Sequence, residues 1–350
     1  MSQIALAPGA GSAVWVAAAI RKLMSVVITL LGLLALTFII GRVMPLDPVL
    51  SIVGPDADQS TYDQVYRQLG LDQPLLTQFW LYLKGLLQGD LGDAILTGNA
   101  VVADIVRVFP ATLELASVAI VVGAVLGIPL GVFAATRQGR WQDQVVRVLS
   151  LVGYSTPIFW LGMMGLLVFY AWLNWVGGVG RIDLAFDGLV PRRSGMLLLD
   201  SALAGNWEAF RSTINHLLLP ASILGLNSMA YIARMTRSFM LAQLSQEYVL
   251  TARVKGLSER QVVWRHAFRN ILVQLLTIVA LAYGNLLEGA VLIETVFAWP
   301  GFGRYLTDGL LLGDMNAVMG SVLVIGLIFI GLNLLSDALY RVLDPRTRPA

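Results

Sequence analysis

Six long, nearly uncharged stretches of this 350-residue chain constrain its fold more than any other feature. A helix needs roughly 20 apolar residues to cross the hydrocarbon core of a membrane, which is about 30 Å thick. Charged residues make up 13% of the chain, whereas a soluble domain usually carries about 25%. The sequence therefore predicts an all-α membrane protein with six transmembrane helices. These lie near residues 23–43, 113–135, 149–172, 214–235, 271–293 and 317–339.

The Lys and Arg residues are distributed unevenly between the two sets of connecting segments. Fifteen of the 24 basic residues, but only five of the 22 acidic ones, lie in the N-terminus, 136–148, 234–270 and the C-terminal tail. Basic residues accumulate on the cytoplasmic side of a membrane. Both termini are therefore predicted to be cytoplasmic, with residues 1–22 as an N-terminal extension and 341–350 as a tail. The first helix is interpreted as an uncleaved anchor because no small-residue cleavage site follows it.

The segment 44–107 is predicted to lie on the outer side, where it is too long for a simple connection. Gln78–Leu83 has the pattern of an amphipathic helix at the membrane interface. Two interpretations stay open at this stage. The segment either packs the outer ends of the helices as a lid or offers a docking surface for a soluble receptor.

The cytoplasmic loop 236–270 is predicted to form a helical elbow. Ser245 is expected to cap a first helix that ends at Lys255, and Gly256 suits the left-handed position that terminates a helix. Ser258 and Gln261 have the spacing of a capping box that begins a second helix, which runs to Asn270. The apolar side of the first helix is predicted at Leu241, Leu244, Tyr248, Thr251 and Ala252. The alternative is a basic loop that only contacts lipid headgroups.

Residues Glu247–Leu257 read EYVLTARVKGL, and residues 265–270 read RHAFRN. These residues resemble the EAA loop of ABC-importer permeases, in the form found in the dipeptide/oligopeptide/nickel branch of the binding-protein-dependent, type I family. Further similarity lies at Pro110–Ala116, at Thr156–Gly162 and at Glu294–Gly303. The resemblance covers nearly the whole chain from about residue 21, with residues 108–340 as the type I transmembrane core.

Three features depart from the pattern of this family. Gln274 stands where members usually have proline, so that the fifth span is expected to begin straighter. Leu46 stands where many members have glycine, and the first 20 residues extend beyond the usual start. None of these departures touches the motif of the loop.

The resemblance implies a permease subunit in the bacterial inner membrane that forms half of a pathway for short peptides or a similar solute. It implies a second, different permease chain, two ABC ATP-binding subunits on the cytoplasmic loops and an extracytoplasmic solute-binding protein. By carry-over, Glu247, Tyr248, Ala252 and Gly256 belong to the contact with the ATPase, and Arg265 and His266 support the second helix. No nucleic-acid partner is expected.

This chain is not expected to hydrolyse ATP or to bind a cofactor itself. A phosphate-binding Walker loop needs a Gly-Lys-Ser/Thr sequence. The lysines are Lys22, Lys84 and Lys255, and none of them follows a glycine. ATP and magnesium are therefore assigned to a separate subunit. His216 and His266 lie in different segments, and His216 is interpreted as a cap at the end of a span.

Two further features stand out in or beside the predicted spans. Glu288 is costly to bury, so that it is a candidate for the pathway together with Asn285 and Glu294, although it could also be solvated at the interface. Gly123, Gly127 and Gly131 recur every four residues, which favours close packing of neighbouring helices.

Other functions fit the sequence less well. Nickel chelates, glutathione and sugar- or opine-like conjugates remain alternative substrates, since importers of these solutes share the same motifs. An ion-coupled secondary transporter would predict inverted repeats and several charges within the membrane. Neither feature is found, and a membrane scaffold without transport is the third alternative.

Overall fold

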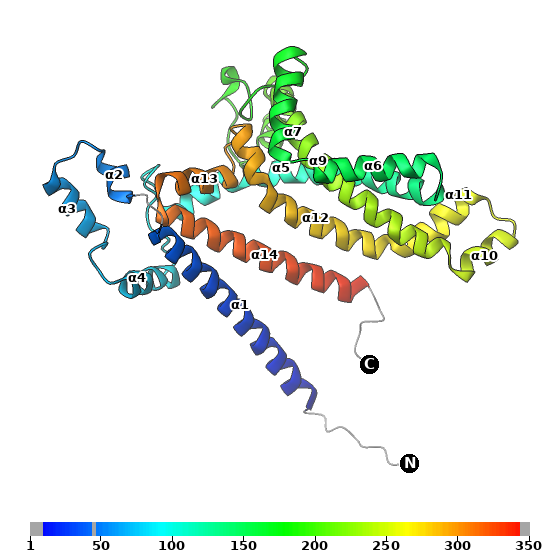
Figure 1. Ribbon diagram of the computed structural model, residues 1–350, viewed down its shortest axis with the longest axis horizontal. Coiled ribbons are helices and arrows are strands. Elements are labelled where there is room, and N and C mark those ends of the chain that lie inside the picture. Colours follow the sequence, from blue (N-terminus) through cyan, green and yellow to red (C-terminus); the bar gives the residue numbers. More distant parts are fainter. Residues whose placement is uncertain (1–9, 44–46, 344–350) are drawn as a thin grey trace. The chain divides into compact units, whose positions relative to one another are not determined.

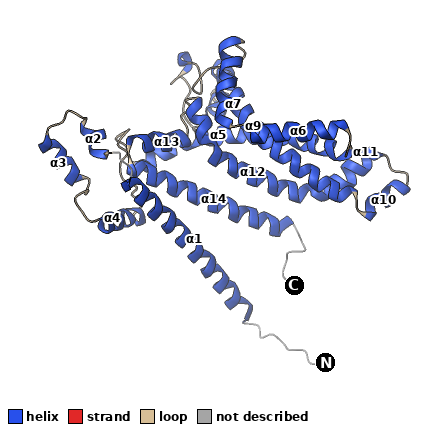
Figure 2. Ribbon diagram, viewed as in Figure 1, coloured by secondary structure: helices blue, strands red, loops and turns tan. Residues whose placement is uncertain are grey.

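The computed structural model describes residues 10–43 and 47–343, and it describes side chains at 20–42, 47–50, 52–287 and 289–335. The described residues are mostly helical and contain no strand (Figure 2). This confirms the predicted all-α class. Leu46 and residues 1–9 and 344–350 lie outside the described part, and the predicted orientation of the termini stays a prediction.

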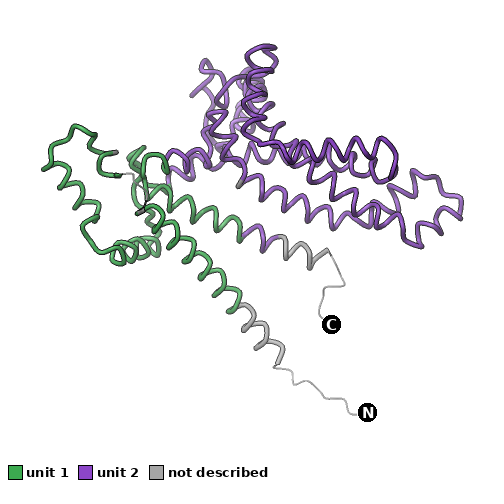
Figure 3. Tube along the Cα trace, in the orientation of Figure 1, with its two compact units in different colours: residues 1–102, 309–330 green, residues 103–308, 331–350 purple. Residues whose placement is uncertain are grey.

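Contacts divide the chain into two compact units, which are coloured separately in Figure 3. Unit 1 contains residues 1–102 and 309–330, and unit 2 contains residues 103–308 and 331–350. In this division the start of the last long helix groups with the N-terminal segments. Each unit is described by itself below.

Unit 1 begins with the long helix α1, Ala10–Val43. Three short helices follow, namely α2 Pro48–Val53, α3 Gln59–Gln68 and α4 Leu75–Leu87. Asp47 caps α2 by accepting hydrogen bonds from the amides of Val49 and Leu50, and Asp58 caps α3. Short polar side chains at these positions satisfy amides that have no partner inside the helix. The predicted interfacial helix at 78–83 thus lies within α4.

The first part of helix α14, Met315–Leu343, completes unit 1. Asp314 precedes it and accepts hydrogen bonds from the amides of Ile95 at 2.5 Å and Ala317 at 3.0 Å. Asn316 donates to the carbonyl of Asp93 at 3.0 Å. Asp314 therefore caps α14 and also holds the turn at residues 90–100. This turn and the start of α14 form one structural element.

Unit 2 is a bundle of long helices. Its main members, labelled in Figure 1, are α5 Val101–Thr136, α6 Trp141–Ser155, α7 Ile158–Gly165, α9 Trp207–Leu244 and α12 Phe268–Val296. Shorter elements connect them, namely η1 Leu166–Trp172, η2 Leu184–Phe186, α8 Leu197–Leu203, α10 Glu247–Val254, α11 Glu259–Gln261 and η3 Val262–Ala267. Helix α13, Phe302–Leu312, follows α12.

The predicted span 149–172 is not one straight helix. Thr156 is extended and precedes Pro157, and α6 and the α7–η1 segment are bent by 95° at this break. A residue before proline is disfavoured in the helical region, which explains where the break occurs. The described residues contain five helices that are long and apolar enough to cross a membrane, or six if the bent pair counts as one span.

The glycine repeat of α5 packs against α9. A Cβ at Gly127 would lie 2.9 Å from the carbonyl oxygen of Met229, and a Cβ at Gly131 would lie 2.5 Å from that of Ala233. Only glycine permits this close approach of the two backbones. The predicted role of the repeat in helix packing is therefore confirmed.

Candidate functional site: a helical elbow and the opposite end of the bundle

The loop between α9 and α12 forms a helical elbow that we define as residues 245–267 (Figure 1). Its corner is Gly256, which has a φ of +80°, as the sequence predicted for a residue that ends a helix. Ser258 caps α11 with the predicted capping box, in which Gln261 is the second member. Arg253 and Glu259 form an ion pair across the corner at 2.8 Å. The elbow is thus a folded element and not an irregular connection.

The predicted start of the first helix was wrong. Ser245 is the C-terminal cap of α9, and its hydroxyl donates to the carbonyl of Ala242 at 3.0 Å. Helix α10 begins only at Glu247, after Gln246, which makes no side-chain cap. Helix α10 therefore begins two residues later than the serine signal suggested, because the same residue type can end one helix as well as begin another.

The inner side of the elbow is a small apolar cluster. Val249, Ala252 and Val262 are buried, and Leu244 and Leu257 pack against them. The predicted apolar side was therefore partly wrong, since Tyr248 and Thr251 are exposed. Ala252 is only 6% exposed, and its small side chain lets α10 approach the second helix.

The outer side of α10 exposes two large apolar residues. Leu250 is 63% exposed and Val254 is 80% exposed. Together with Glu247 and Thr251, which are also exposed, they follow the i, i+3, i+4, i+7 spacing of one helix face. We call these four residues the α10 face. Tyr248 lies beside it and donates a hydrogen bond to Gln243 at 2.8 Å.

The second arm of the elbow joins α12 without interruption. Residues Val262–Ala267 form a turn of π-helix, in which Arg265 is exposed and His266 is half-buried. Val263 and Ala267 are buried against Val132 and Met240 of the bundle. Helix α12 then continues as one α-helix through Gln274, at the place where a proline was expected from the family pattern.

An ion pair that no local sequence pattern indicates fixes the base of the elbow. Arg237 of α9 forms two hydrogen bonds with Asp143 of α6, at 2.6 and 2.7 Å. The Asp143 side chain is 1% exposed and also accepts from the amide of Gly139. The two residues lie 94 positions apart, so that no local pattern connects them.

The opposite end of α12 carries a buried carboxylate. Glu294 is 0% exposed and accepts hydrogen bonds from the hydroxyl of Thr112 at 2.5 Å and the amide of Arg304 at 3.0 Å. Thr112 in turn accepts from the amide of Phe302, and the indole of Trp299 donates to the carbonyl of Ala111. This places Glu294 inside unit 2 and away from any open surface of it, in contrast to the predicted place along the pathway.

The other two pathway candidates are placed differently. Asn285 is exposed on α12, one face of which also exposes Leu281, Gly289 and Leu292. Glu288 falls on the same face by helical register, but its side chain lies outside the described residues. The pathway assignment of Asn285 and Glu288 stays a prediction.

Further buried polar groups hold the segment between α7 and α9. Glu114 binds the guanidinium of Arg181 at 2.5 Å and accepts from the amide of Leu198 at 2.6 Å. Burial alone would raise the pKa of Asp200, but hydrogen bonds from Ser194, Gly195 and Arg193 outweigh it, so that this pKa lies below the ordinary value. His216 contacts the carbonyl of Ser212 through Nδ1 at 2.9 Å. Within the described ranges, no group of three His, Asp or Glu residues could hold a metal ion.

Comparison with known proteins decides the family. Residues 127–349 match the family described as "Binding-protein-dependent transport system inner membrane component", and residues 16–116 match its N-terminal family. The chain belongs to this family of inner membrane components of binding-protein-dependent transport systems. The predicted membership and the predicted location in the bacterial inner membrane are thereby confirmed.

Two curated relatives are similar over nearly their full length. The probable D,D-dipeptide transport system permease protein DdpB of Escherichia coli K12 is 42% identical over 328 residues, which cover 93% of this chain and 96% of the relative. The di/tripeptide transport system permease protein DppB of Pseudomonas aeruginosa UCBPP-PA14 is 40% identical over 329 residues, with coverage of 94% and 97%.

A solved structure supports the fold. The inward-facing MetNI methionine ABC transporter contains a chain that matches with a TM-score of 0.52 and 18% identity, over 69% of this chain and 96% of that chain. This similarity confirms the predicted type I ABC importer permease fold.

Proposed function

We propose that this chain forms half of the membrane pathway of an ATP-driven importer for short peptides. The support for the substrate class is that the two relatives described above are permeases for dipeptides or tripeptides, and that they match nearly the whole chain. The observation that carries the link to an ATPase is the α10 face, where Leu250 and Val254 are exposed on a folded elbow. Large apolar side chains on a structured, charged loop are typical of a surface that a partner covers.

ATP hydrolysis is proposed to reside in separate ABC subunits, with this chain binding neither ATP nor magnesium. Two such subunits would dock on the elbow of this chain and on the equivalent loop of a second permease. Glu247, Tyr248 and Val254 would contact the groove of the ATPase directly. Ala252 and Gly256 would act indirectly, because Ala252 is packed inside the elbow and Gly256 sets its corner.

The second permease is proposed to be a homologous but different chain. It would face the exposed side of α12, where Asn285 and Glu288 would line the shared pathway. An extracytoplasmic binding protein would deliver the peptide on the side of the membrane opposite to the elbow. Glu294 would hold the end of α12 in place there through its buried hydrogen bonds.

Reconstitution tests the proposed substrate class. The chain is co-purified with its partner permease, both ATPases and the binding protein, and uptake of a labelled dipeptide into proteoliposomes is measured with and without ATP. We expect uptake that requires both ATP and the binding protein. ATP-dependent uptake of a nickel chelate, glutathione or a sugar conjugate, but of no peptide, would show that the proposed substrate class is wrong. Uptake driven by an ion gradient without any ATPase would overturn the importer itself.

A further inference from the structure

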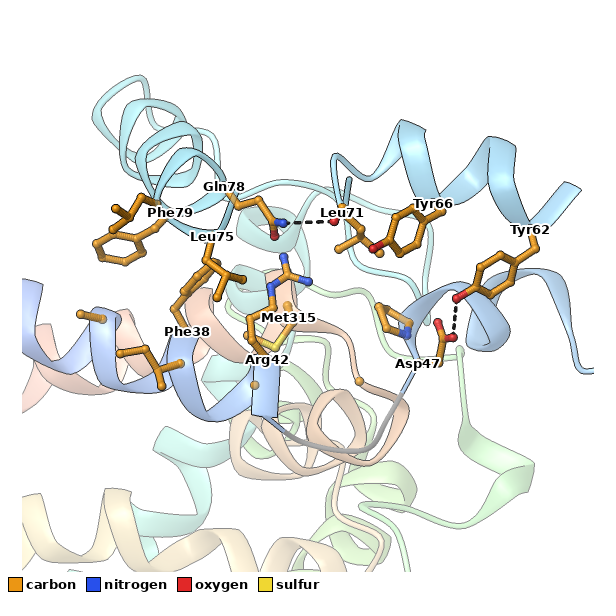
Figure 4. Close-up of a pocket in the computed structure, with 16 residues that line it drawn as sticks. Phe38, Arg42, Asp47, Tyr62, Tyr66, Leu71, Leu75, Gln78, Phe79 and Met315 are labelled. Atoms are coloured by element: carbon orange, nitrogen blue, oxygen red, sulfur yellow. Dashed lines mark hydrogen bonds between the residues drawn. The ribbon is translucent and has the colours of Figure 1, made fainter. Parts of the chain in front are cut away.

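Unit 1 contains a cavity of about 820 Å³ at the end of α1, and the proposed transport function does not use it (Figure 4). Aromatic and aliphatic side chains form most of its walls. Phe38 of α1 and Phe79 of α4 lie with ring centroids 5.3 Å apart at one side, and Tyr62 and Tyr66 of α3 lie at the other. Leu75 and Met315 are among the aliphatic residues of the lining. The cavity is therefore suited to a ligand that is mainly hydrocarbon.

One cation points into this apolar cavity. The guanidinium of Arg42 lies between Gln78 and Met315 in Figure 4, and its Nε is buried without a hydrogen-bond partner among the described residues. Its carbon atom lies 5.2 Å from the centre of the Phe38 ring. A buried guanidinium nitrogen that lacks an acceptor is costly, so that an anionic ligand would be stabilised here.

The carboxylate in the lining of the cavity is already engaged. Asp47 caps α2 and also accepts a hydrogen bond from the hydroxyl of Tyr62 at 2.7 Å. The amide nitrogen of Gln78 donates to the carbonyl oxygens of Gln73 and Leu71, while its Oε1 is buried without a partner. Asp47 therefore has local roles of its own, and the Gln78 oxygen could accept a hydrogen bond from a hydroxyl group of a ligand.

An apolar stripe on α1 leads directly to this cation. Gly32, Ala35, Ile39 and Arg42 follow the i, i+3, i+4 spacing of one helix face, and Ala35, Ile39 and Arg42 line the cavity. Ile39 is 59% exposed, and nothing lies within 4 Å of a Cβ placed at Gly32. The ten residue-to-residue steps from Gly32 to Arg42 rise about 15 Å, which is half of the roughly 30 Å hydrocarbon core. The stripe thus has the length of one leaflet.

We propose that this cavity binds one anionic phospholipid, with an acyl chain along the stripe and the phosphate at Arg42. Residues Ile20–Arg42 form a candidate membrane span, so that Arg42 lies at its end, at the depth of the headgroups. A guanidinium at this depth can pair with the phosphate of a lipid headgroup through charge-assisted hydrogen bonds. A soluble peptide would satisfy the guanidinium equally well, but it would leave the exposed apolar stripe without an occupant. An anionic phospholipid therefore fits both the guanidinium of Arg42 and the apolar stripe.

Native mass spectrometry of the purified full-length chain with added phosphatidylglycerol tests this site. We expect Arg42→Gln to bind one lipid fewer at saturation of the wild type, with affinity lower by about five- to tenfold. Arg42→Lys should retain most of the binding, because it keeps the charge at the headgroup. Arg67→Gln removes an exposed cation of the same unit that does not line the cavity, and it should leave binding unchanged. Equal occupancy in Arg42→Gln and wild type would overturn the proposal.

A second measurement uses only the wild-type chain and therefore does not require the Arg42 variants to fold. A phosphatidylglycerol with a photoreactive acyl chain is added to the wild-type chain, both alone and in the assembled transporter, and labelled peptides are mapped. Labels within residues 32–39 support the site, and competition by unlabelled phosphatidylglycerol but not by phosphatidylcholine supports the role of the headgroup charge. Labels at the opposite end of α1 only, or cross-links from Ile39 to the second permease without any lipid label, would overturn it.

Discussion

The two ends of unit 2 are built on opposite principles. At the end where α12 finishes, the polar side chain of Glu294 is fully buried and is satisfied within the chain by Thr112 and Arg304. At the other end, the elbow buries only a small cluster around Val249 and exposes Leu250 and Val254. Helix α12 joins the two ends over 29 residues, or about 43 Å.

The two ends therefore differ in whether they need a partner protein. Hydrogen bonds at the Glu294 end have their partners inside the chain, so that substitutions there should act on stability first. The exposed apolar residues of the α10 face have no such partners inside unit 2. Substitutions there should leave the isolated chain intact and act on assembly. The Asp143–Arg237 ion pair at the base of the elbow resembles the Glu294 end, because both partners lie inside the chain. Substitutions of this pair should therefore act on stability first.

Arg237→Leu is expected to have the largest effect on stability. It leaves the carboxylate of Asp143 buried without its cation, which costs about 3–5 kcal/mol. Thermal unfolding of the purified chain in detergent measures the loss, and Arg260→Leu serves as a control because Arg260 is exposed. The double substitution with Asp143→Leu should recover part of the loss. If Arg237→Leu alone unfolds like the control, the ion pair does not hold the base of the elbow.

Glu294→Leu should come next. It leaves the hydroxyl of Thr112 and the amide of Arg304 without their acceptor. A fully buried donor without a partner costs about 1–3 kcal/mol, and the partly buried Arg304 amide costs less, so that we expect a loss of about 2–4 kcal/mol. Glu294→Gln keeps an acceptor oxygen and should be milder. The same thermal unfolding assay applies. If Glu294→Leu left stability unchanged but abolished transport, Glu294 would instead act in the pathway.

Gly256→Val should have an intermediate effect that is local to the elbow. A branched side chain at a φ of +80° costs about 1–3 kcal/mol of backbone strain, although the space around Gly256 is open. Gly256→Asn should cost less, since asparagine adopts this region more readily. We expect an assembled transporter whose ATPase activity responds poorly to substrate and binding protein. Normal stimulation in the valine variant would argue against the elbow as the coupling element.

Asp200 should contribute a smaller, pH-dependent effect at the end opposite to the elbow. Its pKa in the folded chain lies below the ordinary value of about 3.9, because the hydrogen bonds outweigh the effect of burial. Its stabilising contribution is therefore present above pH 4 and is lost as the pH falls through the lowered pKa. Unfolding measured across this acidic range should show a weaker pH dependence in Asp200→Asn than in wild type. Parallel curves would contradict this assignment.

The sequence predicted the features that depend on local patterns. The long apolar runs indicated the spans, and Gly256 and the Ser258–Gln261 box indicated the corner of the elbow. It could not predict pairings between distant residues, such as Asp143 with Arg237 or Thr112 with Glu294, because nothing in either local pattern specifies the partner. The serine signal at Ser245 failed for a different reason, since a serine at the junction of two helices can cap either of them.

Substitution of the α10 face should have the smallest effect on the stability of the chain. Val254→Asp should change the stability of the isolated chain by less than about 0.5 kcal/mol, because Val254 is 80% exposed. Leu184→Asp is the matched control, since Leu184 is 91% exposed in η2, outside the elbow.

The decisive measurement is the amount of ATPase that co-purifies with the permease pair carrying each substitution. We expect Val254→Asp to lose most of the bound ATPase while remaining folded, and Leu184→Asp to retain it. Wild-type amounts of ATPase bound to the Val254→Asp variant would contradict the proposal that the ATPase docks on the elbow.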